Sequence, residues 1–193
     1  GTLISSLVDF STPAGQLDNV TDADNGAQLG IAVESVDLSR GNWHYSIDGG
    51  TTWQALGSVS GSSARLLAAD ANTRIYLEPN ANFNGAINSA ITFRAWDRTV
   101  GANGGTGNPN GGIGGTTAFS FDADSASLTI VSVNDAPDGA DRTIPMGEDT
   151  TYTFAASDFG FTDPDDNPAN MLSFVKITTL PAAGALKLNN VAI

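Results

Sequence analysis

Residues 91–96 read Ile-Thr-Phe-Arg-Ala-Trp, with apolar side chains at positions 91, 93 and 95. Alternation with a period of two is typical of a strand that buries one face, so this stretch predicts a β-strand. Further along the chain, residues 128–133 and 151–154 follow the same pattern. The first of these slips phase at Ile130-Val131, as a β-bulge would require.

Turn residues separate the predicted strands. Asp48-Gly49-Gly50 lies between two aromatic stretches and predicts a hairpin turn. Only residues 63–70 have helical character, and this stretch is short. Many short strands joined by Gly, Asn, Asp and Pro predict an all-β fold, a β-sandwich with Greek-key connections.

The chain is strongly acidic. Its 193 residues include 21 Asp and Glu against 8 Lys and Arg, a formal net charge of -13, and 18 of the acidic residues are Asp. Asp favours turns and metal-binding loops, and bound divalent cations would relieve repulsion among so many carboxylates. The charge argues against a nucleic-acid partner, which needs basic patches. With no cysteine and no apolar run of about 18 residues, the sequence predicts neither disulfides nor membrane insertion.

An acidic linker continues from the predicted strand at 128–133. It reads Val-Asn-Asp-Ala-Pro over residues 133–137, and a second acidic turn, Thr-Asp-Pro-Asp-Asp, follows at 162–166. Ca²⁺ takes about six to eight oxygen ligands, which short Asp and Asn side chains on turns supply densely. We therefore expect a Ca²⁺ ion at the junction of two β-domains.

Weak internal similarity indicates a tandem repeat. The stretch 21–25 matches 162–166, and the stretch 41–45 is echoed in the same order by 184–188. We therefore expect two domains. Residues 1–137 would form one long β-sandwich repeat that lacks its first residues, and residues 138–193 would form the N-terminal part of a second, incomplete repeat.

Val-Asn-Asp-Ala-Pro at the end of a strand resembles the linker of bacterial cadherin-like repeats, which occur in large RTX-type surface adhesins. The Thr-Asp-x-Asp segments at 21–24 and 162–165 resemble the turn through which cadherin repeats hold Ca²⁺. Residues 21–137 carry further landmarks of one long repeat type: Thr-Asp-Ala-Asp-Asn-Gly-Ala-Gln, Gly-Asn-Trp-His-Tyr-Ser-Ile-Asp-Gly-Gly-Thr-Thr-Trp, Pro-Asn-Ala-Asn-Phe-Asn-Gly and Phe-Arg-Ala-Trp-Asp. The resemblance implies tandem Ig-like or cadherin-like β-sandwich repeats. Residues 138–193 match only the opening of a generic repeat.

The resemblance also implies particular metal ligands. It places an interdomain Ca²⁺ site around four residues of the linker and the acidic turn: Asn134, Asp135, Asp163 and Asp165. Asp97 would face the next domain, from an acidic turn after a strand. Asp22 and Asp24 would be the matching ligands at the upstream end of the first repeat, and Glu148 would serve the far end of the second. Ala136 stands where many cadherins have another Asn, which implies fewer or weaker ions.

An Asx turn that bonds only to the backbone is the alternative for any single Asp, such as Asp22. Clustered carboxylates without a cation would repel each other, which favours Ca²⁺ for the set around Asp163.

Two features resemble parts of enzymes. Residues 46–53 match the Asp-box pattern of sialidases, but a propeller would need several copies, so we expect a structural hairpin. His44 is the only histidine, without a second His or any Cys for zinc and without a Gly-x-Ser-x-Gly elbow. We expect His44 to be a strand residue with its imidazole at the surface, and the protein not to be an enzyme.

Residues 101–115 hold eight glycines and no lysine, so they form no P-loop. We expect a mobile excursion between two strands; the alternative is a Ca²⁺ loop that uses Asp97, Asn103 and Asn108. The three tryptophans, Trp43, Trp53 and Trp96, are expected in the core, with a sugar-stacking platform as the alternative.

These observations favour one function and leave a second open. The first is a Ca²⁺-binding extender or adhesion module of a large bacterial surface or secreted protein, with Ca²⁺ stiffening the interdomain junction. Its partners would be neighbouring repeats and a glycan or protein target on another cell, in an extracellular location. The alternative is a carbohydrate- or protein-binding sandwich that contacts ligand directly, which an exposed aromatic row on one sheet would favour. A hydrolase fragment has little support.

The last 56 residues supply only the opening strands of a sandwich. So few strands cannot bury both layers, and their edges would be open to pairing. We therefore expect residues 138–193 to be completed from outside this chain.

Overall fold

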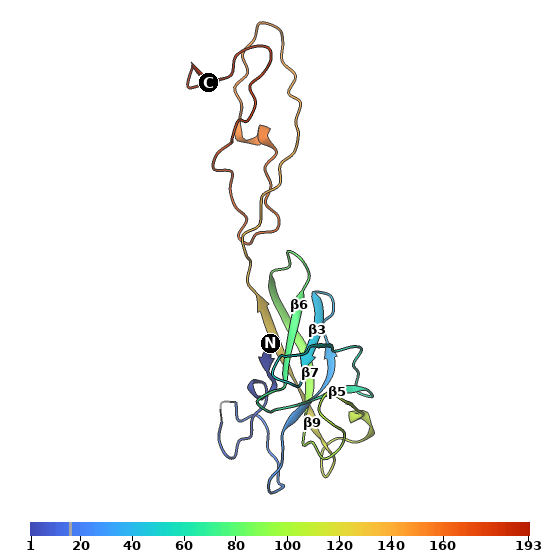
Figure 1. Cartoon of the computed structure of the whole chain (residues 1–193). Coiled ribbons are helices and arrows are strands. Elements are labelled where there is room, and N and C mark those ends of the chain that lie inside the picture. Colours follow the sequence, from blue (N-terminus) through green and yellow to red (C-terminus); the bar gives the residue numbers. More distant parts are fainter. Residues whose placement is uncertain (16) are drawn as a thin grey trace. The chain divides into compact units, whose positions relative to one another are not determined.

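The computed structural model describes residues 1–15 and 17–193 and divides the chain into two compact units, Gly1–Ser132 and Val133–Ile193. The division falls close to the predicted boundary at Pro137 and places the acidic linker in the second unit. Figure 1 shows the strands of the first unit and the long irregular segments of the second.

Two antiparallel sheets build the first unit, which confirms the predicted all-β sandwich. The smaller sheet has the order β1-β6-β3-β4 and consists of β1 (Thr2–Leu3), β6 (Arg74–Pro79), β3 (Gly41–Ser46) and β4 (Gln54–Ala55). The larger has the order β8-β5-β2-β7-β9 and consists of β8 (Thr106–Gly107), β5 (Ala64–Ala68), β2 (Gly30–Val36), β7 (Gly85–Trp96) and β9 (Phe119–Ile130). The chain crosses between the two sheets five times, after β1, β2, β4, β5 and β6. Two short 3₁₀ helices, η1 (Ile4–Ser6) and η2 (Pro109–Gly111), complete the unit.

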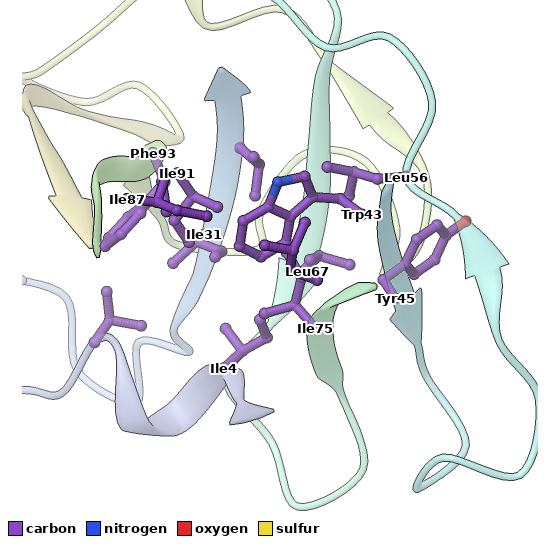
Figure 2. Packing of buried hydrophobic residues seen from close by; sticks show 14 of the residues in the cluster. Ile4, Ile31, Trp43, Tyr45, Leu56, Leu67, Ile75, Ile87, Ile91 and Phe93 are labelled. Atoms are coloured by element: carbon purple, nitrogen blue, oxygen red, sulfur yellow. The ribbon is translucent and has the colours of Figure 1, made fainter. Parts of the chain in front are cut away.

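The main core lies between the two sheets. Figure 2 shows Trp43 and Tyr45 of β3 gathered with Ile31 of β2 and Leu67 of β5, and all four are buried. Phe93 of β7 joins the same core, as its place in the alternating stretch 91–96 predicts. Fully burying an apolar side chain of this size contributes roughly 1.5–3 kcal/mol, so this layer accounts for much of the stability of the unit.

A second, smaller core covers the outer face of the larger sheet. Its members are buried and come from strands or their flanks: Ala32, Ala64, Leu66, Trp96, Ala118 and Phe119. The glycine-rich segment lies over it, and Pro109 within this segment is fully buried. A Cβ on Gly101 would lie only 2.4 Å from Leu66 Cδ1, so the backbone approaches the sheet closely. The segment expected to be a mobile excursion therefore packs as an outer layer on the sheet, and its mobility stays a prediction.

The same two cores explain why the stretch 63–70 contains the strand β5 and not the short helix that its pattern suggested. Leu66 and Leu67 are neighbours in β5, and each is buried in a different core. A strand with both faces covered shows no alternation, so its pattern does not distinguish it from a buried helix.

The second unit contains little regular structure. Its described strands are β10 (Lys187–Leu188) and β11 (Val191–Ala192), which form a hairpin, and its one described helix is η3 (Ala156–Phe159). The strand predicted at 151–154 is not formed, because its backbone pairs with no strand among the described residues of this unit. Large apolar side chains are exposed here, including Phe174 at 83% and Met171 at 88%. The predicted completion from outside the chain stays a prediction.

Candidate functional site

An acidic cluster lies within the second unit, where the linker meets the acidic turn. An isolated antiparallel bridge joins Asp138 to Thr162, through N–H···O bonds of 2.8 and 3.0 Å. Thr162 directly precedes the turn and Asp138 closely follows Asn134 and Asp135, so the bridge brings the two acidic stretches side by side. The linker is thereby held against a turn that begins almost thirty residues later.

Asp163 is the most buried carboxylate of the cluster, with a relative exposure of 6%. Its Oδ2 accepts a 2.6 Å hydrogen bond from the backbone N–H of Asn170. Its Oδ1 is buried and has no hydrogen-bond partner. An ionised oxygen removed from water without a partner is strongly unfavourable, so this atom points to a missing positive group.

Asp166 is the second buried carboxylate, with a relative exposure of 9%. Its Oδ1 accepts a 2.8 Å bond from the backbone N–H of Asp135, and its Oδ2 accepts a bond from the side-chain amide of Asn170. The same amide reaches Asn134 Oδ1 at 3.2 Å, and Asn134 Nδ2 donates to the carbonyl of Asp135 at 2.9 Å. These contacts tie linker and turn into one polar network.

The donor set suits Ca²⁺ better than a transition metal. Within residues 1–15 and 17–193, no group of three His, Cys, Asp or Glu side chains is arranged to hold a metal ion. The cluster instead combines two carboxylates with asparagine amides and backbone carbonyls, which are hard oxygen ligands of the kind Ca²⁺ accepts, with water filling the remaining positions. The buried Asp163 Oδ1 has no hydrogen-bond partner, and this is the observation that fits a cation to these residues.

The structure brings together three of the four predicted junction residues: Asn134, Asp135 and Asp163. Asp165 lies in the same turn and is half-buried. Two members of the cluster, Asp166 and Asn170, were not predicted as ligands. Asp166 is adjacent to the acidic pattern, whereas Asn170 carries no signal beyond its place after the turn at Asn167-Pro168.

Glu148, predicted for the far end of the second repeat, is exposed in a turn closed by a 2.6 Å bond from Thr150 Oγ1 to the carbonyl of Gly147. None of the described hydrogen bonds of the acidic cluster involves Glu148. Its role as a ligand stays a prediction.

A second acidic feature is a groove of about 690 Å³ in the first unit. It is lined by five aspartates from three segments: Asp22, Asp24, Asp97, Asp122 and Asp124. Asp22 Oδ1 accepts a 2.9 Å bond from the N–H of Asp24, which is the Asx turn given above as the alternative. Asp97 Oδ1 likewise accepts bonds of 2.8 and 2.6 Å from the N–H and hydroxyl of Thr99.

Asp97 lies at one end of the paired strands β7 and β9. Asp97 follows Trp96, the last residue of β7, which pairs with Phe119 at the start of β9. The chain leaves the first unit after Ile130, at the other end of β9. A twelve-residue strand spans about 36 Å. Asp97 therefore lies with Asp22 and Asp24 at the end of the first unit opposite to Ile130, and the expectation that it faces the next domain stays a prediction.

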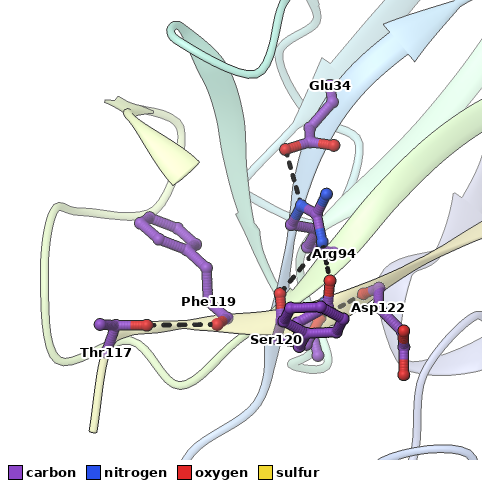
Figure 3. Close-up of polar contacts among 8 residues, drawn as sticks. Glu34, Arg94, Thr117, Phe119, Ser120 and Asp122 are labelled. Atoms are coloured by element: carbon purple, nitrogen blue, oxygen red, sulfur yellow. Dashed lines mark hydrogen bonds and ion pairs between the residues drawn. The ribbon is translucent and has the colours of Figure 1, made fainter. Parts of the chain in front are cut away.

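Arg94 reaches from β7 to the start of β9, where Ser120 lines the groove, and Figure 3 shows its polar contacts. Its Nε lies 3.0 Å from Glu34 Oε1, and its Nη1 donates to the carbonyls of Ser120 and Phe121. The pairing of β7 and β9 is irregular here, between Arg94 and Trp96, and the bulged stretch leaves Phe121 70% exposed. Bulges of this kind bend a strand locally and redirect its side chains.

The Asp-box stretch forms the predicted structural hairpin. Asp48 Oδ1 accepts bonds of 2.7 Å from Ser46 Oγ and 2.9 Å from the N–H of Thr52, and Asp48 Oδ2 accepts a 2.6 Å bond from Thr52 Oγ1. These bonds, led by the Thr52 hydroxyl, lower the pKa of Asp48 to about 2. The carboxylate of Asp48 therefore stabilises the turn of its own hairpin.

Aromatic residues divide between the core and one outer face. Trp43 and Trp96 are buried, as expected, and their indole N–H groups donate to the carbonyls of Asp37 and Val100 at 2.9 and 2.8 Å. Trp53 instead lies half-buried with Tyr76 and His44, outside the main core. The ring of His44 stacks on that of Tyr76 with 5.0 Å between centroids, and the ring of Trp53 meets Tyr76 edge-on at 4.6 Å.

His44 therefore departs partly from expectation. It is a β3 residue, as predicted, but its ring is half-buried against Tyr76, and its Nδ1 is buried without a partner.

No protein-family model, curated protein or solved structure matches this chain. Among the described helices, none is long and apolar enough to cross a membrane.

Proposed function

We propose that this protein is a Ca²⁺-binding extender or adhesion module of a large, repetitive bacterial surface or secreted protein, acting outside the cell. In this role Ca²⁺ stiffens the junction between neighbouring repeats, which are the immediate partners of the chain. The role is binding and mechanical, without catalysis. The resemblance to cadherin-like repeats of RTX-type adhesins supports the same proposal.

The observation that carries the proposal is the buried, unpartnered Oδ1 of Asp163, whose carboxylate shares Asn170 as a hydrogen-bond donor with the buried carboxylate of Asp166. Two buried carboxylates in one network repel each other, and each unpaired charge in a poorly hydrated place costs several kcal/mol at the order-of-magnitude level. A divalent cation would satisfy both. Asn134, from the linker, would supply a further oxygen, so that a bound ion would join the linker to the turn.

The charge of the whole chain supports the same conclusion. A formal net charge of -13 on 193 residues disfavours compaction through self-repulsion. Cations bound at the cluster, and near the aspartates of the groove in the first unit, would lower this repulsion. The predicted roles of Asp22 and Asp24 as ligands at the upstream end belong to this proposal.

Thermal unfolding with and without Ca²⁺ tests the proposal. An ion that binds only the folded state stabilises it by about 2.7 kcal/mol at a hundredfold excess over its Kd, and extracellular sites bind at about 10⁻⁴–10⁻³ M. Millimolar Ca²⁺ should therefore raise the unfolding temperature of the second unit, followed by NMR, and EGTA should reverse the rise.

Asp163→Asn keeps the shape of the side chain and removes its charge, so it should abolish most of the response. Asp141→Asn, at an exposed position of the same unit, is the matched control and should respond like the wild type. A melting curve that EGTA leaves unmoved in the wild type would refute a structural role for Ca²⁺.

A second candidate function rests on the half-buried aromatic residues His44, Tyr76 and Trp53. His44 and Tyr76 are cross-strand partners of β3 and β6, on the face of the smaller sheet opposite to Trp43 and Leu77. Asn42 and Glu78 pair next to them and are exposed, so aromatic rings lie beside hydrogen-bonding groups. Such a combination is suited to a sugar ring and supports a carbohydrate-binding module.

A glycan array separates the two candidates. Binding that is lost in Trp53→Ala but unaffected by EGTA would favour direct carbohydrate recognition. Absence of binding to every glycan, together with a Ca²⁺-dependent unfolding temperature, would favour the extender module.

A further inference from the structure

Asn170 holds three members of the acidic cluster at once. Its backbone N–H donates to Asp163 Oδ2 at 2.6 Å, and its side-chain Nδ2 donates to Asp166 Oδ2 and, at 3.2 Å, to Asn134 Oδ1. The nitrogen end of the amide must face this way, because an ionised carboxylate can only accept a hydrogen bond. The positive end of the amide dipole therefore lies between one oxygen of the turn and one oxygen of the linker.

We propose that the side-chain amide of Asn170 is a built-in substitute for the cation. It holds Asp166 and Asn134 together when Ca²⁺ is absent, and Ca²⁺ displaces it on binding. This inference rests on the proposed function, since it concerns the same site.

The number of donors explains why the substitute is incomplete. A side-chain amide has two N–H groups, and here both are used, one on Asp166 and one on Asn134. None remains for Asp163 Oδ1, which is buried and unpartnered in a residue with only 6% exposure. The amide is also neutral, so it leaves the charges of both carboxylates uncompensated. Ca²⁺ carries two charges and accepts more ligands, so it is the better occupant.

Two consequences follow for the behaviour of the site. In the ion-free protein the linker stays fastened to the turn, so the site is formed before the ion arrives. The ion must also break the two amide hydrogen bonds, and this competition weakens its apparent affinity. A hydrogen bond to a charged group contributes more than a neutral one, so removing the competing amide should tighten binding by about fivefold to tenfold.

The experiment compares the wild-type chain with Asn170→Ala, which keeps the backbone N–H bond to Asp163 and removes only the amide. Asn189→Ala, at an exposed position of the β10–β11 turn, is the control for loss of an asparagine from the same unit. The readouts are Ca²⁺ affinity by calorimetry and ¹⁵N NMR hydrogen exchange of the full chain in EGTA and in Ca²⁺.

We expect the Asn170 side-chain NH₂ signals of the wild type to be protected in EGTA and to lose protection when Ca²⁺ is added. In EGTA, Asn170→Ala should speed exchange at the Asp135 N–H, whose acceptor Asp166 has lost its second tether. The same variant should bind Ca²⁺ about fivefold to tenfold more tightly, whereas Asn189→Ala should match the wild type in both measurements.

Three results would overturn the proposal. Weaker Ca²⁺ binding in Asn170→Ala would make Asn170 a ligand and not a displaced substitute. Unchanged exchange at Asp135 in EGTA would show that the amide holds nothing together. Protection of the Asn170 NH₂ group that persists in Ca²⁺ would exclude displacement. A wild type that does not bind Ca²⁺ at all would instead refute the proposed function, and the comparison in EGTA would still decide whether the amide holds linker and turn together.

Discussion

The backbone N–H of Asp135 donates a 2.8 Å hydrogen bond to Oδ1 of Asp166, so the linker is fastened to the acidic turn within the second unit. The other oxygen of the same carboxylate, Oδ2, accepts a hydrogen bond from the side-chain amide of Asn170. A single substitution at Asp166 therefore removes both hydrogen bonds.

Asp166→Ala should weaken Ca²⁺ binding by at least about tenfold, because it deletes one of two buried carboxylates and frees the linker N–H. Calorimetric titration of the full chain measures the change. Asp141→Ala removes an exposed carboxylate from the same unit and is expected to leave the affinity close to that of the wild type. Equal affinities for the two variants would count against Asp166 as part of the site.

Arg94→Ala should destabilise the first unit by roughly 2–4 kcal/mol, because Glu34 and the bulge carbonyls lose a shared charged donor. The pair is mostly buried, with side-chain exposures of 17% and 13%. Urea unfolding followed by tryptophan fluorescence reports on this unit, which contains all three tryptophans. Glu34→Gln keeps an acceptor and should cost only about 1 kcal/mol. The interpretation fails if the two variants lose the same stability.

Gly101→Ala should destabilise the first unit more than Gly26→Ala. The two glycines have nearly the same backbone angle, φ of 83° and 80°, so the strain of a left-handed alanine is matched. They differ in surroundings: a Cβ at Gly101 would lie 2.4 Å from Leu66 Cδ1, whereas one at Gly26 has nothing within 4 Å. The difference between their unfolding free energies therefore measures the packing of the glycine-rich layer. Equal losses would show that this segment does not press on the sheet.

Asp48 should contribute an acid-sensitive part of the stability of the first unit. Its pKa is lowered from 3.8 to about 2 by hydrogen bonds, first of all from Thr52. A lowered folded-state pKa stabilises the fold above about pH 4, and this contribution disappears as the pH falls through about 2. Asp48→Asn should therefore lose stability at pH 5 but unfold more like the wild type near pH 2. A gap between the two proteins that is constant with pH would contradict the lowered pKa.

Sequence patterns correctly predicted the features that depend on residues close together in the chain. The alternation at 91–96 correctly placed Phe93 in the main core, because the period of a strand is built into its backbone. The hairpin around Asp48 was also predictable, since all its side-chain bonds lie within Ser46–Thr52. By contrast, the contacts of Asn134 and Asp135 with the acidic turn join residues far apart in sequence. Two acidic stretches suggested a shared site, but no local pattern determines which atoms meet.

Features that depend on register or on a covering layer could not be predicted. The stretch around Leu66 and Leu67 was predicted as helical because its apolar residues do not alternate. They do not alternate because the glycine-rich layer covers the second face of β5. The position of Asp97 depends on which end of β9 lies beside it, and the pairing of Trp96 with Phe119 decides this. Asn170 joins the site through its amide and backbone together, and no single-residue pattern indicates that.

All described hydrogen bonds of the acidic cluster are made between residues 134 and 170, so the linker and the turn form one continuous cassette of sequence. One contiguous segment of the second unit therefore carries both partners of each of these hydrogen bonds. Under the proposed function, such a segment could be inherited or transplanted as a single block. Recombination that lengthened the proposed array would then move the linker and the turn together.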